Sequence, residues 1–280
     1  MKIDLHAHTT ASDGRLLPAE LVAKAEHIGL DYLAVTDHDT VSGVVAAQAA
    51  AASCHLCIIP GVEISVTWKR QTIHILGLNI DIQQPDLLSG LAHLQTLRLE
   101  RAKKMGDALA DVGVRAPLAE AQKLASGSSI SRSHFAQVLV EQGFAADVKT
   151  VFRRYLVPKK PGFVGVQWVP LAQAVGWICA AGGDAVIAHP ARYRLTRSKL
   201  LTLVADFKQA GGVGLEVVSS SHSHNETHNM ADIADKTGLV SSRGSDYHGI
   251  PGQWGTLGQI PPLPKRCRPV WAEWGLHEAC

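Results

Sequence analysis

The stretch that decides the fold is KIDLHAHTTASDG at residues 2–14, where a short β-type run leads directly into two histidines and an aspartate. His6 and His8 stand two residues apart in an extended segment, so both side chains project on one side and can bind one metal ion. Asp13 follows in the same stretch. Because β/α barrel enzymes build their active sites just beyond the C-terminal ends of the strands, these residues predict a barrel strand followed by a functional loop.

Short β-type runs alternate with helical stretches along much of the chain. We expect strands at residues 2–5, 31–35, 56–59 (running on to 65), 71–76, 185–188, 213–217 and 239–241. We expect helices at residues 18–27, 41–53, 171–181, 198–210 and 226–237, several of which begin at Pro, Ser or Thr and end at Gly. This alternation is typical of a parallel sheet or barrel in an α/β fold, and seven strands suit a barrel.

The middle of the chain departs from this alternation. From about residue 85 to residue 155 the pattern is helical, and the segment PKKPG at residues 158–162 cannot continue a helix. We therefore expect a first barrel part at residues 1–84 and a helical insertion that caps the substrate at residues 85–160. A second barrel part follows at residues 161–280 and ends in a Pro-rich surface strap.

The composition is that of a folded globular chain, with 280 residues, 46% hydrophobic and 19% charged, and a formal net charge of +2. So small a net charge provides no bulk reason for tight, non-specific binding to duplex DNA. The sequence has no run of 18 apolar residues and no secretory leader, so we expect no membrane span and a cytoplasmic location. No obligate protein partner is evident. The anomaly is the count of 14 histidines.

Histidines and carboxylates recur just beyond the predicted strand ends. They stand in HAH at 6–8, TDHDT at 36–40, GVEIS at 61–65, AHP at 188–190 and GSDYH at 244–248, with His74 inside the fourth strand, Glu216 after a later one and SRSH at 131–134 in the insertion. Each element alone has an ordinary explanation, because a single histidine is readily accommodated as a hydrogen-bonded residue. A set at so many strand ends needs a common cause, and divalent metals with mixed nitrogen and oxygen ligands supply one.

These motifs resemble those of the polymerase and histidinol phosphatase (PHP) family, and they span residues 6–248. The resemblance implies a distorted seven-stranded β/α barrel that holds two or three divalent metal ions, manganese first among them, with zinc, iron or magnesium as alternatives. The central helical insertion is similar to that of one branch of the family. This branch contains nucleoside 3′,5′-bisphosphate phosphatases and 5′-3′ exoribonucleases.

Matched motif by motif, the resemblance implies three metal sites. The first would consist of His6, His8, Glu63 and Asp246, the second of Glu63, His74 and His134, and the third of Asp13, His38 and His248. Glu63 would bridge two ions. Asp13 stands where other members of the family use a histidine, an exchange that favours manganese or magnesium at the third site.

The implied metal centre predicts phosphate ester hydrolysis. Two closely spaced cations can hold a water as hydroxide, neutralise phosphoryl oxygens and stabilise the leaving oxygen. We expect Glu63 and His189 to be the catalytic residues. His189 would bind a metal, hold a metal ligand in place, donate to phosphate or protonate the leaving group, and the plain alternative is an inert hydrogen-bonded histidine beside Pro190.

Arginines in the insertion provide the signal for the substrate. Arg98 and Arg101 continue the apolar stripe of a helix, where a charge needs a partner. Arg132 follows Ser131 at a predicted helix start, where a guanidinium and backbone N–H groups can bind phosphate. Solvated helix charge is the alternative for the arginines. We expect Arg101, Ser131, Arg132 and His189 to contact a nucleotide or short RNA substrate.

A metal site on the barrel and arginines on the cap imply a substrate with two separated phosphates. We expect a phosphoric monoester hydrolase that removes the 3′-phosphate of nucleoside 3′,5′-bisphosphates, such as 3′-phosphoadenosine 5′-phosphate. The alternatives are a 5′-3′ exoribonuclease acting on short 5′-phosphorylated RNA, a histidinol phosphatase, an amidohydrolase-type barrel and a non-catalytic PHP module. The presence of every implied ligand position argues against the last of these.

Overall fold

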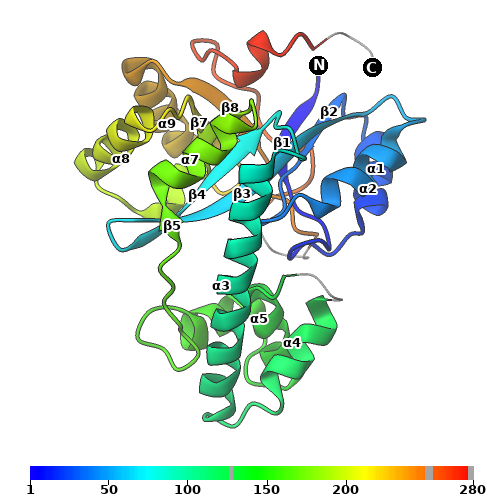
Figure 1. Ribbon diagram of the computed structural model, residues 1–280, viewed down its shortest axis with the longest axis vertical. Helices are drawn as coiled ribbons and strands as arrows, with labels where there is room; N and C mark the ends of the chain where they lie inside the picture. The colour runs from blue at the N-terminus through cyan, green and yellow to red at the C-terminus, as the bar shows by residue number, and fades with distance from the viewer. Residues whose placement is uncertain (126–128, 250–254, 277–280) are drawn as a thin grey trace.

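The strands form one sheet that curls into a nearly closed barrel (Figure 1). The computed structural model describes residues 1–125, 129–249 and 255–276. Within these ranges the strand order is β1 (Ile3–Ala7), β2 (Tyr32–Val35), β3 (Cys57–Trp68), β4 (Gln71–Leu78), β6 (Asp184–Ile187), β7 (Gly214–Ser219) and β8 (Val240–Gly244), with the short β5 (Val169–Pro170) paired to β3. The chain after β8 returns beside β1, where the His8 N–H donates to the Tyr247 carbonyl at 2.9 Å.

The predicted seven-stranded α/β barrel is confirmed, with one correction to its strand directions. The pairs β1–β2, β2–β3, β6–β7 and β7–β8 are parallel, as the alternation with helices predicts. In contrast, β4 runs antiparallel to both of its neighbours. The reason is a two-residue hairpin turn after β3, in which Lys69 and Arg70 have left-handed φ angles of 44° and 67°.

The outer surface of the barrel is covered by helices, and each of them corresponds to a helix predicted from the sequence. They are α1 (Pro18–His27), α2 (Ser42–Ala51), α7 (Leu171–Ala180), α8 (Arg197–Gln209) and α9 (His224–Thr237). Figure 1 shows α1 and α2 on one side of the sheet and α7, α8 and α9 on the other side. Leu21 of α1 and Phe207 of α8 belong to the same apolar core as Leu33 and Val35 of β2.

The other face of the strands changes from apolar to ionisable along its length. Ile59 of β3 and Leu78 of β4 belong to a second apolar cluster, against which Val270 of the C-terminal segment packs. Glu63 stands four residues after Ile59, and His74 stands four residues before Leu78. Since side chains alternate with period two along a strand, each pair lies on one face of the sheet. The barrel therefore has an apolar floor and an ionisable mouth.

A helical cap extends from the barrel on the long helix α3 (Pro85–Ala110), as Figure 1 shows. The first half of α3 packs Leu87, Leu91 and Leu94 into the barrel core. Its second half packs Met105 and Leu109 into a separate core. The other elements of this part are α4 (Pro117–Ala125), α5 (Arg132–Glu141), α6 (Val148–Val151) and the π-helical turn η1 (Phe152–Leu156). The expected boundary at residue 85 thus falls at the start of a helix that both cores share.

Two short helices follow the strands β6 and β8. The short helix η2 (Pro190–Tyr193) follows β6, and η3 (Val270–Glu273) lies in the segment after β8.

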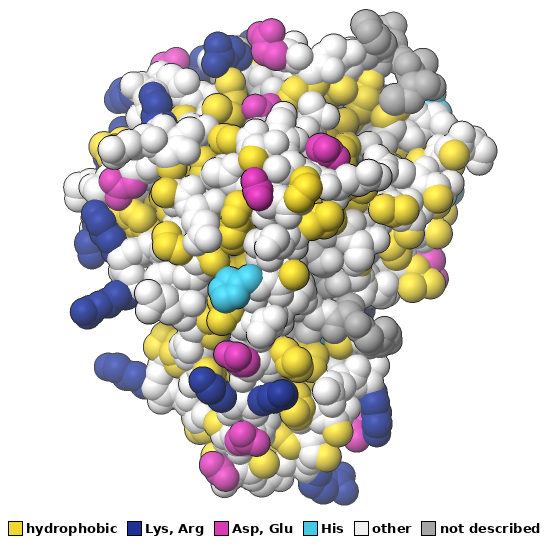
Figure 2. Space-filling model, in the orientation of Figure 1, with side chains coloured by type: hydrophobic (Ala, Val, Ile, Leu, Met, Phe, Trp, Pro, Cys, Tyr) yellow, Lys and Arg dark blue, Asp and Glu magenta, His cyan; other side chains and the backbone are white. Residues whose placement is uncertain are grey.

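On the face drawn in Figure 2, basic and acidic side chains are interspersed over barrel and cap, in keeping with the net charge of +2. None of the helices in the described part of the chain combines the length and hydrophobicity that crossing a lipid bilayer requires.

Candidate functional site

Most of the predicted ligand residues converge at one mouth of the barrel. In the described residues, three groups have ligand atoms that all lie within 4.8 Å of one another. The groups are His6, His8, Glu63 and Asp246; His8, Asp13, His38 and His248; and His38, Glu63 and His74. Their members come from strand ends that are far apart in the sequence. The structure therefore brings together the residues of the first and third sets that the resemblance implies.

Glu63 lies at the centre of these groups and is fully buried on β3. Its Oε2 lies 3.4 Å from His6 Nε2, 3.3 Å from His8 Nε2 and 2.9 Å from His38 Nδ1. Its Oε1 lies 2.9 Å from His74 Nδ1. The two carboxylate oxygens thus face different imidazoles, which is the arrangement needed for one carboxylate to bridge two cations.

The electrostatics keep this central carboxylate ionised. Burial alone would raise the pKa of Glu63, but the charges of His38, His74 and His6 outweigh burial and hold that pKa well below its usual range. The pKa of Asp246 is also held well below its usual range, because His6 and Arg192 outweigh burial. Both residues are therefore acceptors at neutral pH, the form in which a carboxylate binds a metal.

Asp13 takes part in the cluster together with His8, His38 and His248. Its Oδ1 lies 3.2 Å from His248 Nε2 and 3.8 Å from His38 Nε2. Ser133 of the cap donates from its hydroxyl to the other oxygen, Oδ2, at 3.0 Å. Burial would raise the pKa of Asp13, yet the charges of His248 and His38 hold it well below its usual range. The barrel mouth and the cap therefore meet at this carboxylate.

Several buried ligand atoms lack a hydrogen-bond partner among the described residues. They are His6 Nε2, Nδ1 and Nε2 of His8, Asp13 Oδ1, His38 Nδ1 and Glu63 Oε2. A buried polar atom left unsatisfied costs about 1–3 kcal/mol, so a cluster of such atoms is typical of a site built for cations. Imidazole nitrogens and carboxylate oxygens together suit Mn, Zn and Fe, and the residues present therefore fit a centre of divalent metal ions.

Of the expected second set, Glu63, His74 and His134, the structure brings Glu63 and His74 together in the third group. His134 belongs to none of the three groups. It is the third residue of α5, and its Nδ1 accepts a hydrogen bond from the Ser131 N–H at 3.1 Å. A metal on Nε2 would require the proton to be on Nδ1, where it would face this N–H donor. The capping contact is therefore incompatible with metal binding through Nε2.

His189 occupies the place expected for His134. Its Nε2 lies 2.9 Å from Glu63 Oε1, the same oxygen that faces His74. The residue has a left-handed φ of 30°, and its N–H donates to a Glu216 oxygen at 2.5 Å. Such a backbone is strained for a non-glycine residue and persists only where the surroundings determine it. Burial and the neighbouring Arg192 lower the pKa of His189 to about 3, so its imidazole is neutral at physiological pH.

Arg98 is the one cap arginine of the three predicted that has a carboxylate partner among the described residues. It is 6% exposed, and its Nε donates to Asp39 Oδ2 at 2.6 Å. Its Nη2 donates to the Ser65 hydroxyl at 3.0 Å. Asp39 follows His38, and Ser65 lies two residues after Glu63. Arg98 therefore joins α3 to two of the segments that carry the ligand cluster.

Arg101 and Arg132 have no carboxylate partner among the described residues. The Nε of Arg101 is buried without a hydrogen-bond partner in that part of the chain. Burial, then the charges of Arg132 and Arg98, hold the pKa of Arg101 well below its usual range. The pKa of Arg132 is lowered by burial and by Arg98. Ser131 precedes Arg132 as the N-cap of α5, and its hydroxyl accepts from the Ser133 N–H at 3.0 Å. These residues form a cationic site on the cap.

Comparison with known proteins agrees with this geometry. Residues 4–163 match the PHP domain. The chain belongs to the PHP family. It is 47% identical to a 3′,5′-nucleoside bisphosphate phosphatase of Chromobacterium violaceum, over 97% of this chain and 95% of the relative. It is 41% identical to the 5′-3′ exoribonuclease Rnm of Escherichia coli, over 97% of this chain and 93% of the relative. The predicted family and branch are confirmed, and the protein is a phosphoesterase.

Solved structures support the same assignment to the PHP fold. A Chromobacterium violaceum structure described as an amidohydrolase with bound sulfate and no metal superimposes with a TM-score of 0.95 at 46% identity, covering 100% of this chain and 99% of that one. A metal-dependent phosphoesterase of Bifidobacterium adolescentis gives a TM-score of 0.82 at 27% identity, covering 92% and 91%. The ligand clusters of this PHP chain and the metal dependence named for a structural relative are therefore in agreement.

Two residues of the PHP site had no assigned role in the sequence prediction. Glu216, fully buried at the end of β7, accepts from His6 Nδ1 at 3.0 Å, which leaves His6 Nε2 free for a metal. Arg192 pairs with Asp246 Oδ2, whose other oxygen faces His6 and His8. In the sequence, Glu216 stands after a predicted strand and Arg192 stands two residues after the motif AHP. Neither position indicates which residue the side chain contacts.

A third missed residue, Asp37, shapes the loop of the first PHP motif. It is fully buried in TDHDT and accepts from the Thr9 N–H at 2.7 Å, the Thr9 hydroxyl at 2.7 Å and the Ser12 hydroxyl at 2.6 Å. These bonds hold the loop that runs from His8 to Asp13. The ligands on that loop therefore owe their placement to a carboxylate that is not a member of the three clusters.

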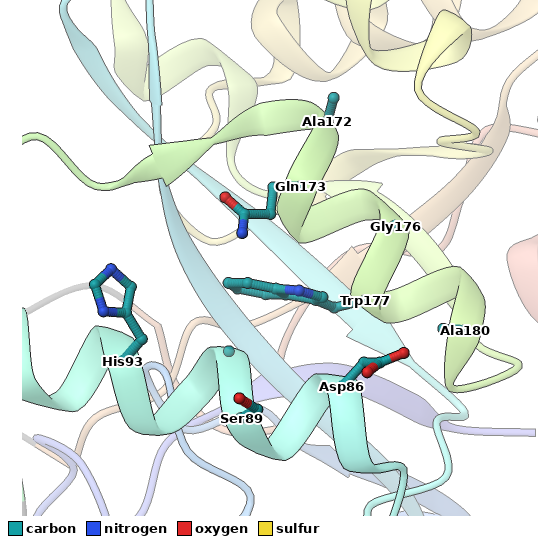
Figure 3. Close-up of a pocket in the computed structure, with 9 residues that line it drawn as sticks. Asp86, Ser89, His93, Ala172, Gln173, Gly176, Trp177 and Ala180 are labelled. Atoms are coloured by element: carbon teal, nitrogen blue, oxygen red, sulfur yellow. The ribbon is translucent and has the colours of Figure 1, made fainter.

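One cleft in the described part of the chain lies away from the PHP site. It has a volume of about 440 Å³ and lies between α3 and α7 (Figure 3). Figure 3 shows the Trp177 ring edge-on, with Gln173 above it, Asp86 below it and His93 to its left. The ring packs on Gly90, where a Cβ would come within 2.5 Å of it. The residues that line this cleft include none from the ligand clusters and neither Arg101 nor Arg132.

The histidines at 222, 224 and 228 lie outside the three PHP ligand groups. His222 uses both ring nitrogens within the protein: Nδ1 donates to the Val217 carbonyl at 3.1 Å, and Nε2 accepts from the Ala191 N–H at 3.4 Å. His224 and His228 are exposed on the first turns of α9. His222 therefore has a structural role next to η2.

Proposed function

We propose that this PHP phosphoesterase removes the 3′-phosphate from nucleoside 3′,5′-bisphosphates. The observation that carries the proposal is the presence of two separate sites for negative charge. One is the ligand cluster around Glu63, which suits divalent cations. The other is formed by Arg101 and Arg132, whose half-buried charges are unfavourable unless an anion pairs with them. One phosphate at each site requires a substrate with two phosphates, and the Chromobacterium violaceum relative is named for such a substrate.

The proposed centre holds two or three divalent cations, manganese foremost. Bound there, the cations would activate water and neutralise phosphoryl oxygens. Glu63 sets their spacing, because its two oxygens face different imidazoles. We assign the second metal site to Glu63, His74 and His189, since both imidazoles lie 2.9 Å from Glu63 Oε1. Glu63 and His189 are the proposed catalytic residues of the centre.

The cap arginines orient the substrate for a displacement at the 3′-phosphorus. Arg101 and Arg132 bind the 5′-phosphate, beside Ser131 at the N-terminus of α5, and thereby hold the 3′-phosphate against the ligand cluster. A water oxygen joins the phosphorus, the bond from phosphorus to O3′ breaks, and O3′ leaves with a proton as the 3′-hydroxyl. The products are a nucleoside 5′-phosphate and inorganic phosphate.

A cleft at the seam of barrel and cap can receive the nucleoside. It has a volume of about 350 Å³ and is lined by Ala11, Thr40, Ser42, Gln95, Leu99, Ser129 and Ile130. Ala11 and Thr40 lie two residues from Asp13 and His38, and Leu99 lies next to Arg98. The cleft therefore adjoins both the ligand cluster and the helix that carries the cap arginines. Its volume is in the range of small-molecule sites.

A 5′-3′ exoribonuclease on short 5′-phosphorylated RNA is the second candidate. Two observations favour it: the 41% identity to the exoribonuclease Rnm, and a cap site that suits a 5′-phosphate whether the nucleotide is free or at an RNA end. In that case the bond broken at the ligand cluster is a phosphodiester.

The deciding experiment compares catalytic efficiencies with Mn²⁺ present. The substrates are adenosine 3′,5′-bisphosphate, adenosine 2′,5′-bisphosphate, adenosine 3′-phosphate and a short 5′-phosphorylated RNA. We expect the highest kcat/KM for the 3′,5′-bisphosphate. A higher value for the RNA would replace the proposal by the exoribonuclease. Absence of activity on all four, together with no bound transition metal in the purified protein, would indicate a non-catalytic module.

A further inference from the structure

His134 is a buried histidine whose role the metal clusters do not explain. It is 5% exposed and stands at the third position of α5. Its Nδ1 accepts the Ser131 N–H at 3.1 Å, while the Ser131 hydroxyl caps the first turn of the same helix. A neutral imidazole that accepts on one nitrogen carries its proton on the other. The helix cap therefore fixes His134 as the tautomer with the proton on Nε2.

The surroundings of His134 keep the ring neutral. Burial lowers the pKa of His134, the charge of Asp13 raises it in part, and the charge of Arg98 lowers it again. The charge of Arg98 also acts on Arg101 and on Arg132. Arg132 and His134 both stand in the first turn of α5, and Ser133 between them donates to Asp13 of the ligand cluster at 3.0 Å. The guanidinium groups of Arg98 and Arg101 both lie over the Trp168 ring, 5.3 Å and 5.8 Å from its centroid.

We propose that His134 donates a hydrogen bond from Nε2 to the phosphate that Arg101 and Arg132 bind, which makes it a specificity residue of the cap. This inference rests on the proposed function, because it assigns a third donor to the same cationic site. Within the described residues His134 makes one hydrogen bond, through Nδ1, so Nε2–H is free to donate.

A neutral donor suits this position better than another charged one. Arg98, Arg101 and Arg132 already repel one another, as the lowered pKa values of Arg101 and Arg132 show. Nε2–H adds a donor without adding to that repulsion. Three donor side chains also match the three non-bridging oxygens of a terminal phosphate, whereas a phosphodiester has two. The site is therefore expected to prefer a terminal phosphate monoester.

Two variants separate the donor from the helix cap. His134→Asn keeps an acceptor near the position of Nδ1, so the Ser131 N–H stays satisfied, but it removes the Nε2 donor. His134→Gln places an amide N–H near the position of Nε2 and removes the Nδ1 acceptor. We expect the donor to be recovered in His134→Gln. We expect it to be lost in His134→Asn, although that variant keeps the hydrogen bond from the Ser131 N–H at the start of α5.

The test measures adenosine 5′-phosphate binding to the Mn²⁺-loaded protein by calorimetry. A hydrogen bond to a charged group contributes about 1.5–3 kcal/mol, so His134→Asn should weaken binding by roughly tenfold or more, and His134→Gln should regain most of the affinity. The KM for adenosine 3′,5′-bisphosphate should rise more than the KM for adenosine 3′-phosphate. Both variants should retain the wild-type Mn²⁺ content.

Each contrary result has a distinct meaning. Wild-type affinity of His134→Asn for adenosine 5′-phosphate would overturn the donor role. Loss of Mn²⁺ from His134→Asn would overturn it too, because that result would make His134 a metal ligand. If the wild-type protein binds adenosine 5′-phosphate through His134 but releases no phosphate from bisphosphates, the proposed function fails and the donor role stands.

Discussion

Arg98 Nε donates to Asp39 Oδ2 at 2.6 Å, and both residues are buried. This ion pair connects helix α3 of the cap to the loop that carries His38. Asp39 also accepts from the Ser65 N–H at 2.6 Å through Oδ1 and from Gln95 Nε2 at 2.8 Å through its carbonyl. Its φ of 53° is left-handed. The pair therefore holds a strained residue in place next to a member of the ligand cluster.

Arg98→Met should destabilise the protein by about 3–5 kcal/mol, because it leaves the Asp39 carboxylate buried without its partner. The free energy of unfolding from urea titration measures the loss. The double variant Arg98→Met/Asp39→Asn should recover part of it, since no uncompensated charge remains. Arg101→Met is the matched control and should not lower stability, because Arg101 has no carboxylate to leave unpaired in the described structure. Equal losses for both single variants would contradict the ion-pair account.

Glu63→Gln should abolish turnover and metal loading. Glutamine keeps one oxygen donor but loses the negative charge and the second oxygen, so the side chain could no longer hold two cations between the imidazoles of His6 and His8 and that of His74. We expect phosphate release to fall by more than the roughly 10–100-fold typical of losing a supporting residue of a metal site. Metal content by mass spectrometry and phosphate release by colorimetric assay are the readouts, with exposed Glu100→Gln as control. Wild-type activity in Glu63→Gln would remove the metal-cluster account.

Glu216→Gln should weaken metal binding by about 10–100-fold without unfolding the protein. Glu216 accepts from both His6 Nδ1 and the His189 N–H, and an amide can offer only one acceptor oxygen to these two donors. The His6 ring then loses the contact that fixes its tautomer. Competition with a chelator of known Mn²⁺ affinity provides the measurement. An unchanged metal affinity would show that Glu216 supports the fold alone.

Arg132→Ala should weaken binding of a bisphosphate far more than that of a single phosphate ester. Losing a charge-assisted hydrogen bond corresponds to about 1.5–3 kcal/mol, or roughly a tenfold or larger rise in KM for adenosine 3′,5′-bisphosphate. Lys104→Ala removes an exposed positive charge from the same cap and should change neither KM. Equal effects of Arg132→Ala on the bisphosphate and on adenosine 3′-phosphate would show that Arg132 does not bind the second phosphate.

Metal affinity should rise with pH between pH 6 and pH 8. Burial lowers the pKa of His8, but the neighbouring carboxylates of Asp246 and Glu63, each 3.3 Å from Nε2, outweigh burial and raise it to about 10. Without bound cations the ring is protonated over this range, and a cation must displace that proton. Each displaced proton strengthens apparent binding by about tenfold per pH unit. Mn²⁺ titrations at several pH values, with proton release from calorimetry in different buffers, test this; a pH-independent affinity would contradict it.

Local motifs carry most of the ligand prediction, because short-range geometry decides it. HAH, GVEIS and GSDYH each place ionisable side chains at a strand end, and strand ends of one barrel meet at one mouth. The hairpin at Lys69 and Arg70 escaped prediction, since neither residue type signals a left-handed turn. The sequence also did not predict that Arg98 pairs with a carboxylate while Arg101 has none among the described residues. The partner of Arg98, Asp39, lies about sixty positions away in the chain.

By itself, the sequence determined the family and the seven-stranded barrel, and it predicted the helical insertion and the ligand residues, because the motifs that carry the family resemblance are each only a few residues long. The tertiary structure alone decided which histidine joins His74 at Glu63 Oε1. The sequence prediction placed His134 there and gave His189 a catalytic or phosphate-binding role. The Ser131 N–H occupies Nδ1 of His134, whereas the left-handed backbone of His189 turns Nε2 towards the carboxylate. A histidine binds a metal only when an unprotonated ring nitrogen points towards the ion, and the tertiary structure sets that orientation.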